Sequence, residues 1–167
     1  MNRWSERPSE EQRLLNPAFC SVLLWHAALG YVMESRGHLA MPFEESFLVM
    51  PMVLHRETRN SLPRNAVTSL AAWINTYPLA RATIADRGKL LVHFTKEALY
   101  FGGVHGLLRF PHGGLQANSD WRGKIRRILN DSSDEVRLCN KRSEFVGKWF
   151  ARTGGPETVL TFLGVRP

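Results

Sequence analysis

The side chains most suited to chemistry in this sequence are basic, and most of them fall within one short segment. Trp121 is followed by Arg122, Lys124, Arg126 and Arg127, and Arg109 lies a little earlier in the chain. Because phosphate groups are bound mainly by clustered arginine and lysine side chains, this pattern predicts contact with a nucleic-acid backbone. A basic helix face that is simply solvated gives the same pattern and stays open as the alternative.

The sequence does not predict reading of individual bases. The segment KEALYFGGVHG, residues 96–106, is the candidate recognition helix, and it offers Lys96, Tyr100 and His105. It contains no arginine or asparagine, the residues suited to bidentate contacts with base edges. Any contact with DNA is therefore expected at the backbone.

No motif supports an enzyme. The chain has no GxxxxGK[ST] loop for nucleotide phosphates, no HExxH pair among its six histidines and no CxxC spacing. Glu44 and Glu45 are adjacent carboxylates near a predicted helix start, where they complement the helix dipole, so acid–base catalysis is a weak second explanation. We expect no catalytic residue, cofactor or metal, and a small hydrolase is the least supported function.

Three further reactive side chains lie in apolar surroundings. His26 stands inside the longest apolar stretch, where a core or interface histidine is much commoner than a proton shuttle. Cys20 and Cys139 are far apart in the chain, which favours reduced structural thiols over a disulfide framework.

Composition favours a single compact unit with an anionic partner. The 167 residues are 44% hydrophobic and 22% charged, as is typical of soluble globular proteins. The net charge of +7 and the isoelectric point near 10.0 attract either nucleic acid or an acidic protein surface. The N-terminal stretch MNRWSERPSEEQR shows no signal-peptide pattern, so we expect a cytoplasmic protein.

Residues 16–36, NPAFCSVLLWHAALGYVMESR, form the helix that must organise the fold. Asn16 is suited to cap a helix and Pro17 to occupy its first position. The residues that follow are apolar nearly all round, and the narrow polar stripe contains His26, Gly30 and Glu34. Such a helix is buried on most sides. We reject a transmembrane span, because the apolar run falls short of the roughly 18 to 20 residues that a bilayer requires.

A second apolar segment, residues 43–54, follows a short turn that contains glycine, and Pro51 should kink or end its helix. Short connections favour antiparallel neighbours, so this segment should fold back along the first helix. We expect Leu24, Ala27 and Phe47 to be buried in the core that the two helices form.

The next part of the chain predicts a loop and three helices. The loop spans residues 55–65, and a helix of about 10 residues follows around Leu70 and Ile74. A fourth helix should start at Pro78 and run to about residue 90, and Thr95 should cap a fifth that ends near residue 104.

Two short strands should follow the fifth helix. Residues 106–110 and 115–117 flank the turn Pro-His-Gly-Gly, a pattern typical of a β-hairpin. Helices are then predicted at about 120–129, at about 132–152 after a capping box formed by Ser132 and Glu135, and at 157–163.

The expected fold is therefore mainly α, with a winged-helix-like element and a C-terminal helical segment. We predict one domain over residues 1–167, in which 1–15 form a lead-in arm and about 119–167 form a helical extension. The winged-helix interpretation rests on helices that are followed by a hairpin.

Six blocks of the sequence together resemble a known family. They are NPAFCSVLLW, GY, MPFEESFLVMPMVLHRETR, FTKEALYFGG, KWFARTG and FLGVRP, and they resemble the middle component of three-component ABC-ATPase systems, the class that includes Lamassu-type antiphage defence. The resemblance implies a subunit without enzyme activity, encoded beside an SMC/Rad50-like ABC ATPase and a variable effector, often a nuclease. By analogy of fold, the chain would act as a kleisin-like or KITE-like adaptor near the ATPase heads.

Two functions stay open. In an adaptor subunit, Trp149, Phe150 and Phe162 are candidate partner contacts because aromatic side chains dominate interface hot spots, although their helical spacing fits core packing equally well. The alternative is a stand-alone winged-helix regulator that binds double-stranded DNA by itself. Neither function involves a membrane.

Overall fold

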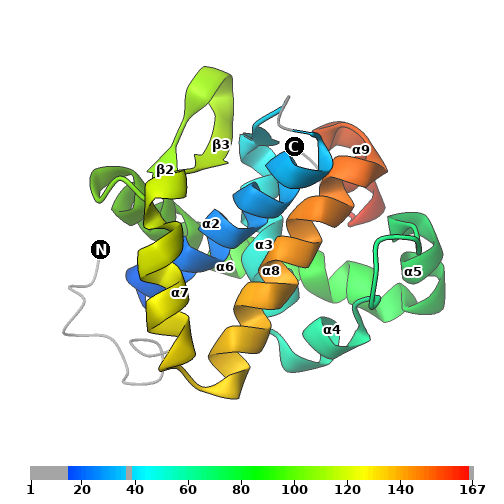
Figure 1. Ribbon diagram of the computed structural model, residues 1–167. Helices are drawn as coiled ribbons and strands as arrows, with labels where there is room; N and C mark the ends of the chain where they lie inside the picture. Colours follow the sequence, from blue (N-terminus) through cyan, green and yellow to red (C-terminus); the bar gives the residue numbers. More distant parts are fainter. Residues whose placement is uncertain (1–14, 37–38, 166–167) are drawn as a thin grey trace.

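The computed structural model describes residues 15–36 and 39–165 of the chain. As predicted, the fold is mainly helical with a small sheet after the long central helices. Figure 1 shows the helices gathered around α2, Pro17–Glu34, while β2 and β3 extend away from this helical body. The predicted lead-in arm lies outside the described residues, except for Leu15.

Asn16 and Pro17 begin α2 as predicted. The Asn16 side-chain oxygen accepts a hydrogen bond from the Ala18 amide at 2.8 Å, and Pro17 occupies the first turn, where its missing N–H has no helical partner to lose. The helix is buried along most of its length. Among the helices of the described residues, none combines the length and apolar character needed to cross a membrane.

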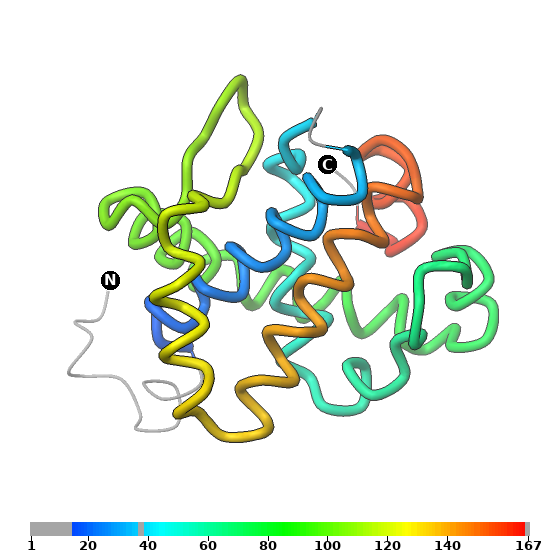
Figure 2. The backbone as a smooth tube through the Cα atoms, in the orientation of Figure 1, coloured from blue at the N-terminus to red at the C-terminus, as the bar shows by residue number. Residues whose placement is uncertain are grey.

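The principal neighbour of α2 is α8, Asp134–Thr153, which lies alongside it in Figures 1 and 2. The stripe of α2 that appeared polar in the sequence faces this helix. A Cβ atom at Gly30 would overlap the backbone carbonyl of Glu144, and Arg152 Nε lies 3.1 Å from Glu34 Oε1. Glycine in the stripe therefore permits close helix packing, and the charged residue at its end forms an ion pair with the neighbour.

Helix α3, Ser46–Val53, contacts α2 as predicted for residues 43–54. However, α8 covers more of the surface of α2 than α3 does. Leu24 and Ala27 are fully buried as expected. Phe47 is only partly buried, which corrects the prediction. Phe47 lines a surface pocket together with residues of α6, and its ring packs against Phe43 with 5.6 Å between their centroids.

Two arginines stabilise the end of α3. Pro51 lies inside this helix, which ends two residues later at Val53. Arg87 Nε donates to the Pro51 carbonyl at 3.2 Å, and Arg59 Nη1 donates to the Val53 carbonyl at 2.8 Å. These guanidinium groups satisfy carbonyl oxygens that have no partner within the helix.

The expected loop over residues 55–65 is wrong in its first half, because Arg56–Ser61 form helix α4. The His55 ring caps this helix, with Nδ1 accepting from the Thr58 amide at 3.3 Å. Burial, followed by the nearby charge of Arg87, lowers the pKa of His55, which favours the neutral ring that can accept this bond. Histidine is not a usual N-cap residue, so no local pattern signals the start of this helix.

The two helices predicted between residues 78 and 104 are one continuous helix, α6, Pro78–Val104. Thr95 does not cap a new helix. It is buried, and its hydroxyl donates to the Leu91 carbonyl at 3.0 Å one turn earlier. The preceding helix, α5, Leu70–Thr76, is slightly shorter than predicted because it begins only after its cap, Ser69.

The predicted hairpin is confirmed. Strands β2, Leu108–Arg109, and β3, Gly114–Ala117, pair antiparallel on either side of a short 3₁₀ segment, Pro111–Gly113. A third strand that was not predicted, β1, Met41–Pro42, pairs with the other edge of β3. The sheet order β1-β3-β2, with α6 leading into the hairpin, is compatible with a winged helix.

The remaining helices are α7, Arg122–Asn130, then α8, and finally α9, Pro156–Phe162, close to their predicted positions. Figure 2 shows α7 and α8 as the two arms of a V. Ser133, rather than the predicted Ser132, caps α8, because its hydroxyl oxygen accepts from the Val136 amide at 3.3 Å.

Candidate nucleic-acid interface

The predicted basic cluster lies on α7, a helix that is exposed over most of its surface. Ile125 is the residue of α7 that is buried, and Leu129, one turn later, is partly buried against the same core. Residues four apart lie on one face of a helix, so these two side chains anchor α7 through a narrow stripe. The other side chains of α7 project towards solvent or towards a neighbouring cleft.

Four of the predicted cations come together on this helix. Arg122 and Arg126 line a cleft between α7 and α8, and Arg127 is exposed. Lys124 Nζ lies 4.7 Å from the centre of the Trp121 ring, a cation–π contact. Within the described residues none of the four is paired with a carboxylate, so their positive charge is available to an anion.

Arg109 lies close to the start of this helix but is partly neutralised. Its Nη2 donates to Asn118 Oδ1 at 3.3 Å and lies 3.9 Å from Asp120 Oδ2. Asn118 and Asp120 belong to the turn that leads into α7 through a 3₁₀ segment, Ser119–Trp121. The fold therefore brings Arg109 near the cluster, although an exposed carboxylate offsets part of its charge.

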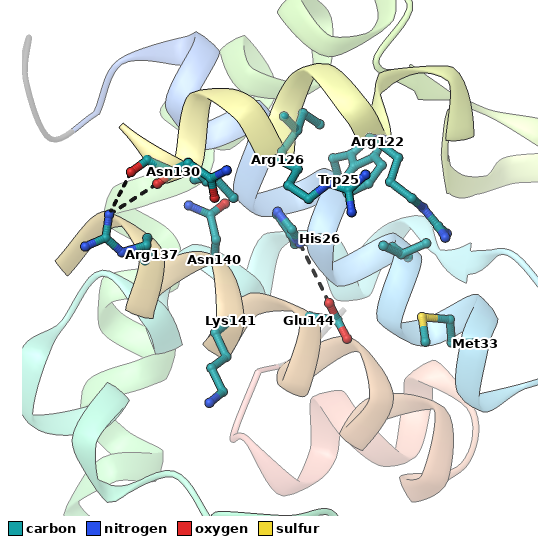
Figure 3. Close-up of a pocket in the computed structure, with 13 residues that line it drawn as sticks. Trp25, His26, Met33, Arg122, Arg126, Asn130, Arg137, Asn140, Lys141 and Glu144 are labelled. Carbon is teal, nitrogen blue, oxygen red and sulfur yellow. Dashed lines mark hydrogen bonds and ion pairs between the residues drawn. The ribbon is translucent and has the colours of Figure 1, made fainter. Parts of the chain in front are cut away.

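The cleft beside α7 has a volume of about 510 Å³ and is built from α2, α7 and α8, as Figure 3 shows. Its apolar walls are Leu29 and Met33 from α2 and Ile125 and Leu129 from α7. Among the described residues, the charged side chains that line it are Arg122, Arg126, Arg137 and Lys141 together with the carboxylate of Glu144. Positive charge therefore predominates in a partly apolar cleft.

Two basic groups interact with Glu144. Lys148 Nζ lies 2.5 Å from Glu144 Oε1, and His26 Nδ1 lies 3.9 Å from Oε2. The His26 ring, together with Lys148, lowers the pKa of Glu144 to about 2 against the opposing effect of burial. The carboxylate is thus ionised at neutral pH, and because Lys148 matches its charge, the cleft keeps a positive balance.

Arg137 has a structural task at the mouth of the cleft. It donates to the carbonyls of Leu129 and Asn130, each at 3.4 Å, as the dashed lines in Figure 3 mark, and also to that of Ser132. Its other nitrogen pairs with Asp134. Arg137 therefore ties the end of α7 to the beginning of α8, whereas Arg122 and Arg126 are free of such bonds.

The cleft contains buried polar atoms that lack hydrogen-bond partners. Asn140 is 1% exposed, and its Nδ2 donates to the Val136 carbonyl at 2.8 Å, but its Oδ1 accepts no bond within the described residues. Among the residues that the structure describes, neither ring nitrogen of His26 has a hydrogen-bond partner either, because 3.9 Å to Glu144 is too long for a hydrogen bond. An unsatisfied buried polar atom destabilises a fold by about 1–3 kcal/mol.

Sequence reasoning missed Asn140 and interpreted His26 as an ordinary core residue. The two side chains come from α8 and α2, which are far apart in the chain and meet only in the folded protein. No local spacing could have signalled the pair. Only the structure shows that both side chains carry buried polar atoms without a hydrogen-bond partner among the described residues.

The three aromatic residues proposed as partner contacts lie in or near the core. Trp149 and Phe150 are buried, and Trp149 Nε1 donates to the Thr68 carbonyl at 2.7 Å. Phe162, on α9, is half-buried. Trp149 and Phe150 therefore pack the interior, the alternative that their spacing left open, and neither is available at the surface of this chain.

An exposed apolar patch lies elsewhere, where α6 meets the hairpin and the turn before α3. We call it the aromatic patch, and it comprises Phe43, Tyr100, Val104 and Phe110. The rings of Phe43 and Phe110 lie 6.4 Å apart, centroid to centroid. Tyr100 was noted in the sequence as a residue of the candidate recognition helix, but its apolar neighbours come from segments that are distant in the chain.

The two cysteine thiols and the carboxyl group of Glu45 are reactive groups that lie buried in the fold. Cys20 and Cys139 are both buried, and burial raises the pKa of the Cys20 thiol to about 12, which keeps it protonated and unreactive. Glu45 is buried too, and neither of its carboxyl oxygens has a hydrogen-bond partner in the described part of the chain. Glu44 and Glu45 do lie at a helix start as predicted, in the 3₁₀ segment Phe43–Glu45 before α3, but this turn folds the Glu45 side chain inwards.

Fold and site together define a small helical protein with a basic helix and a cationic cleft. The chain belongs to the family of ABC-three component (ABC-3C) system Middle Component 3, whose family model matches residues 4–167. No curated protein and no solved structure matches the chain significantly. The resemblance to a middle component of such systems is thereby confirmed.

Proposed function

We propose that this middle component is a non-catalytic accessory subunit that joins an SMC/Rad50-like ABC ATPase to an effector, a nuclease, in a Lamassu-type antiphage defence complex. In this proposal the exposed face of α7 contacts the backbone of double-stranded DNA. Membership of the family supports the accessory role.

The observation that supports the DNA contact is that the four cations on α7 have no acidic partner within the described residues. A solvated basic face usually contains neighbouring carboxylates that offset its charge. Here Arg122, Lys124, Arg126 and Arg127 share one short helix without an acidic partner within the described residues. Such a surface attracts phosphates through non-specific electrostatics and predicts binding that weakens steeply with salt.

The aromatic patch is the surface that we assign to a protein partner. Exposed apolar side chains grouped on one side of a protein mark interaction sites more often than single exposed residues do. Phe43, Tyr100 and Phe110 supply large rings of the kind that dominate interface hot spots. This patch replaces the buried Trp149 and Phe150 as the candidate contact with the ATPase or the effector.

The adaptor role is tested by purification of the tagged chain after expression from its native operon. We expect the ABC ATPase to co-purify, and a Tyr100→Ala/Phe110→Ala variant to recover less of it while keeping the same melting temperature. If the wild-type chain brings down no ATPase, the adaptor proposal is wrong.

DNA contact is tested on the purified complex by fluorescence anisotropy with a labelled duplex. We expect Lys124→Glu/Arg127→Glu to weaken binding at least ten-fold at low salt. Arg56→Glu/Arg64→Glu is the matched control, because it changes the net charge equally on exposed residues of α4 and its flanking loop. If both variants bind duplex equally well, α7 is not part of the DNA interface.

The sheet order favours one second candidate, a stand-alone winged-helix regulator. In this function the hairpin and the exposed Lys96 and Arg109 would contact duplex DNA without any partner protein. The purified chain alone would then bind duplex in a salt-sensitive manner. Absence of binding by the isolated chain at low salt excludes this function and leaves the adaptor role untouched.

A further inference from the structure

We propose that the cleft between α7 and α8 is a binding site for a nucleotide, with the phosphate at Arg122 and Arg126 and the base above His26 and Asn140. This site is separate from the outward face of α7 that carries Lys124 and Arg127. Arg122 and Arg126 also count among the four cations that support duplex contact, so the inference shares these two residues with the proposed function, and duplex binding is tested separately at Lys124 and Arg127.

The charge around the cleft selects an anion. Glu144 is held by Lys148, and Arg137 is occupied by carbonyl groups and Asp134, so neither dominates the balance. Arg122 and Arg126 remain without a partner within the described residues. Guanidinium groups bind the oxygens of phosphate and carboxylate groups through paired N–H donors, and two adjacent guanidinium groups suit the higher charge of a phosphate.

The shape and walls of the cleft require an apolar portion in the same ligand. A volume of about 510 Å³ falls in the range of small-molecule sites. Leu29 and Met33 on one side and Leu129 on the other provide flat apolar contact, and the Trp25 ring, fixed by its bond from Nε1 to the Asn118 carbonyl at 2.9 Å, forms part of the wall. Inorganic phosphate would leave these walls without a partner.

Asn140 and His26, at the bottom of the cleft, offer polar atoms that can pair with the edge of a nucleobase. Within the described residues, Asn140 Oδ1 accepts no hydrogen bond and neither ring nitrogen of His26 has a hydrogen-bond partner. Nucleobases present matching donors and acceptors along their edges, and asparagine commonly pairs with them. Figure 3 shows Asn140 and His26 lying between α7 and α8, where a planar group could enter. Binding would satisfy polar atoms that are otherwise buried without partners.

One ligand chemistry therefore fits all three parts of the cleft, and it is an aromatic base joined to a phosphate. The nucleotide can be free or can be the terminal unit of a nucleic-acid strand, since both present the same groups. Arg122 and Arg126 would contact either source in the same way.

Isothermal titration calorimetry on the full-length chain tests the site with adenosine, cytidine, guanosine and uridine monophosphates. Adenosine and inorganic phosphate serve as the two halves of the ligand. We expect at least one monophosphate to bind at least ten-fold more tightly than either half. Phosphate binding as tight as that of every monophosphate, or no binding by any monophosphate, would overturn the proposal.

Variants locate the binding in the cleft. Arg126→Ala should weaken monophosphate binding at least ten-fold, as expected from the loss of a charge-assisted hydrogen bond. Asn140→Leu should weaken it similarly, and because it could affect folding, its melting temperature is measured in parallel. Arg127→Ala, on the outward face of α7, is the control that should bind nucleotide normally. If Arg126→Ala binds as the wild type does, the cleft is not the site.

A 5′-phosphorylated single-stranded oligonucleotide distinguishes the two sources. If the oligonucleotide competes with the monophosphate and Arg126→Ala abolishes its binding, the site accepts a strand end. If the monophosphate binds but the oligonucleotide does not, the site accepts a free nucleotide. The Lys124→Glu/Arg127→Glu variant should lose duplex binding but keep nucleotide binding. That result would show that duplex and nucleotide bind at different surfaces. Failure of either surface is thus measured independently of the other.

Discussion

Gly147 of α8 packs directly against the backbone of Ala27 in α2. A Cβ atom at position 147 would overlap the Ala27 carbonyl oxygen and lie 2.7 Å from its carbonyl carbon. The obstacle is backbone rather than a flexible side chain, so it cannot move aside. The closest helix pair of the fold is therefore possible only because residue 147 has no side chain.

We expect Gly147→Ala to lower the free energy of unfolding by about 1–3 kcal/mol or more, because the helices must separate to admit the methyl group. Gly123→Ala is the control, since a Cβ atom there meets no neighbour within 4 Å. That change in the exposed α7 should stabilise the protein by up to about 1 kcal/mol. Urea denaturation of both variants measures the difference, and equal effects would contradict the packing argument.

The second prediction concerns the pH dependence that Glu45 introduces. Burial, with a contribution from Glu44, raises the pKa of Glu45 to about 8 from a usual value near 4.5. Between these values the folded state binds more protons than the unfolded state, so this group stabilises the fold at low pH and its contribution falls as pH rises from about 4.5 through 8.

Glu45→Gln keeps the shape of the side chain but cannot ionise. We expect this variant to be more stable than the wild type above pH 8 by a few kcal/mol, the order of magnitude that the raised pKa of Glu45 implies. The difference between the two proteins should shrink steadily towards pH 5. Urea denaturation from pH 5 to 9 measures it, and taking the difference removes the opposing contribution of His55, whose lowered pKa favours folding at higher pH. A difference that does not change with pH would rule out the buried acid as its cause.

Arg59 should contribute more to stability than its ion-pair partner. It is 3% exposed and donates both to the Val53 carbonyl and to Glu135 Oε1, each at 2.8 Å, whereas Glu135 is 68% exposed. Arg59→Ala leaves the Val53 carbonyl with only the weak donor Cys139 Sγ at 3.7 Å and should destabilise the fold by about 2–3 kcal/mol. Glu135→Gln removes only a solvent-screened charge and should lower stability by less than about 1 kcal/mol. Thermal denaturation of both variants tests the ranking, and the reverse order would refute it.

Arg137 should control the local stability of α7. Since α7 is anchored by few apolar residues, the bonds from Arg137 to the Leu129 and Asn130 carbonyls hold its last turn. We expect Arg137→Ala to increase hydrogen exchange of the amides in the second half of α7 by about three- to ten-fold, while the core of α2 is unchanged. Arg142→Ala is the matched control, because Arg142 donates instead to the Pro63 carbonyl at 2.9 Å. Faster exchange in α7 for both variants would show that Arg137 has no special role there.

Local sequence signals predicted most elements of this fold. Asn16 with Pro17 gave the start of α2, and the Pro-His-Gly-Gly turn gave the hairpin, because caps and turns depend on residues that are adjacent in the chain. Predictions failed where a tertiary contact overrode such a signal. Thr95 has the chemistry of a cap but lies buried within α6, and His55, an unusual cap, begins α4.

The sequence by itself determined that this protein has a mainly helical fold, a basic cluster on one short helix and the motif blocks of its family. Those properties depend on residue type and on spacing over a few turns. Only the tertiary structure decided that α8 lies along α2, that Trp149 is interior, and that His26 meets Asn140 beside two arginines. Such contacts join segments far apart in the chain, and which surfaces meet depends on shape and close approach, as at Gly147, rather than on any local pattern.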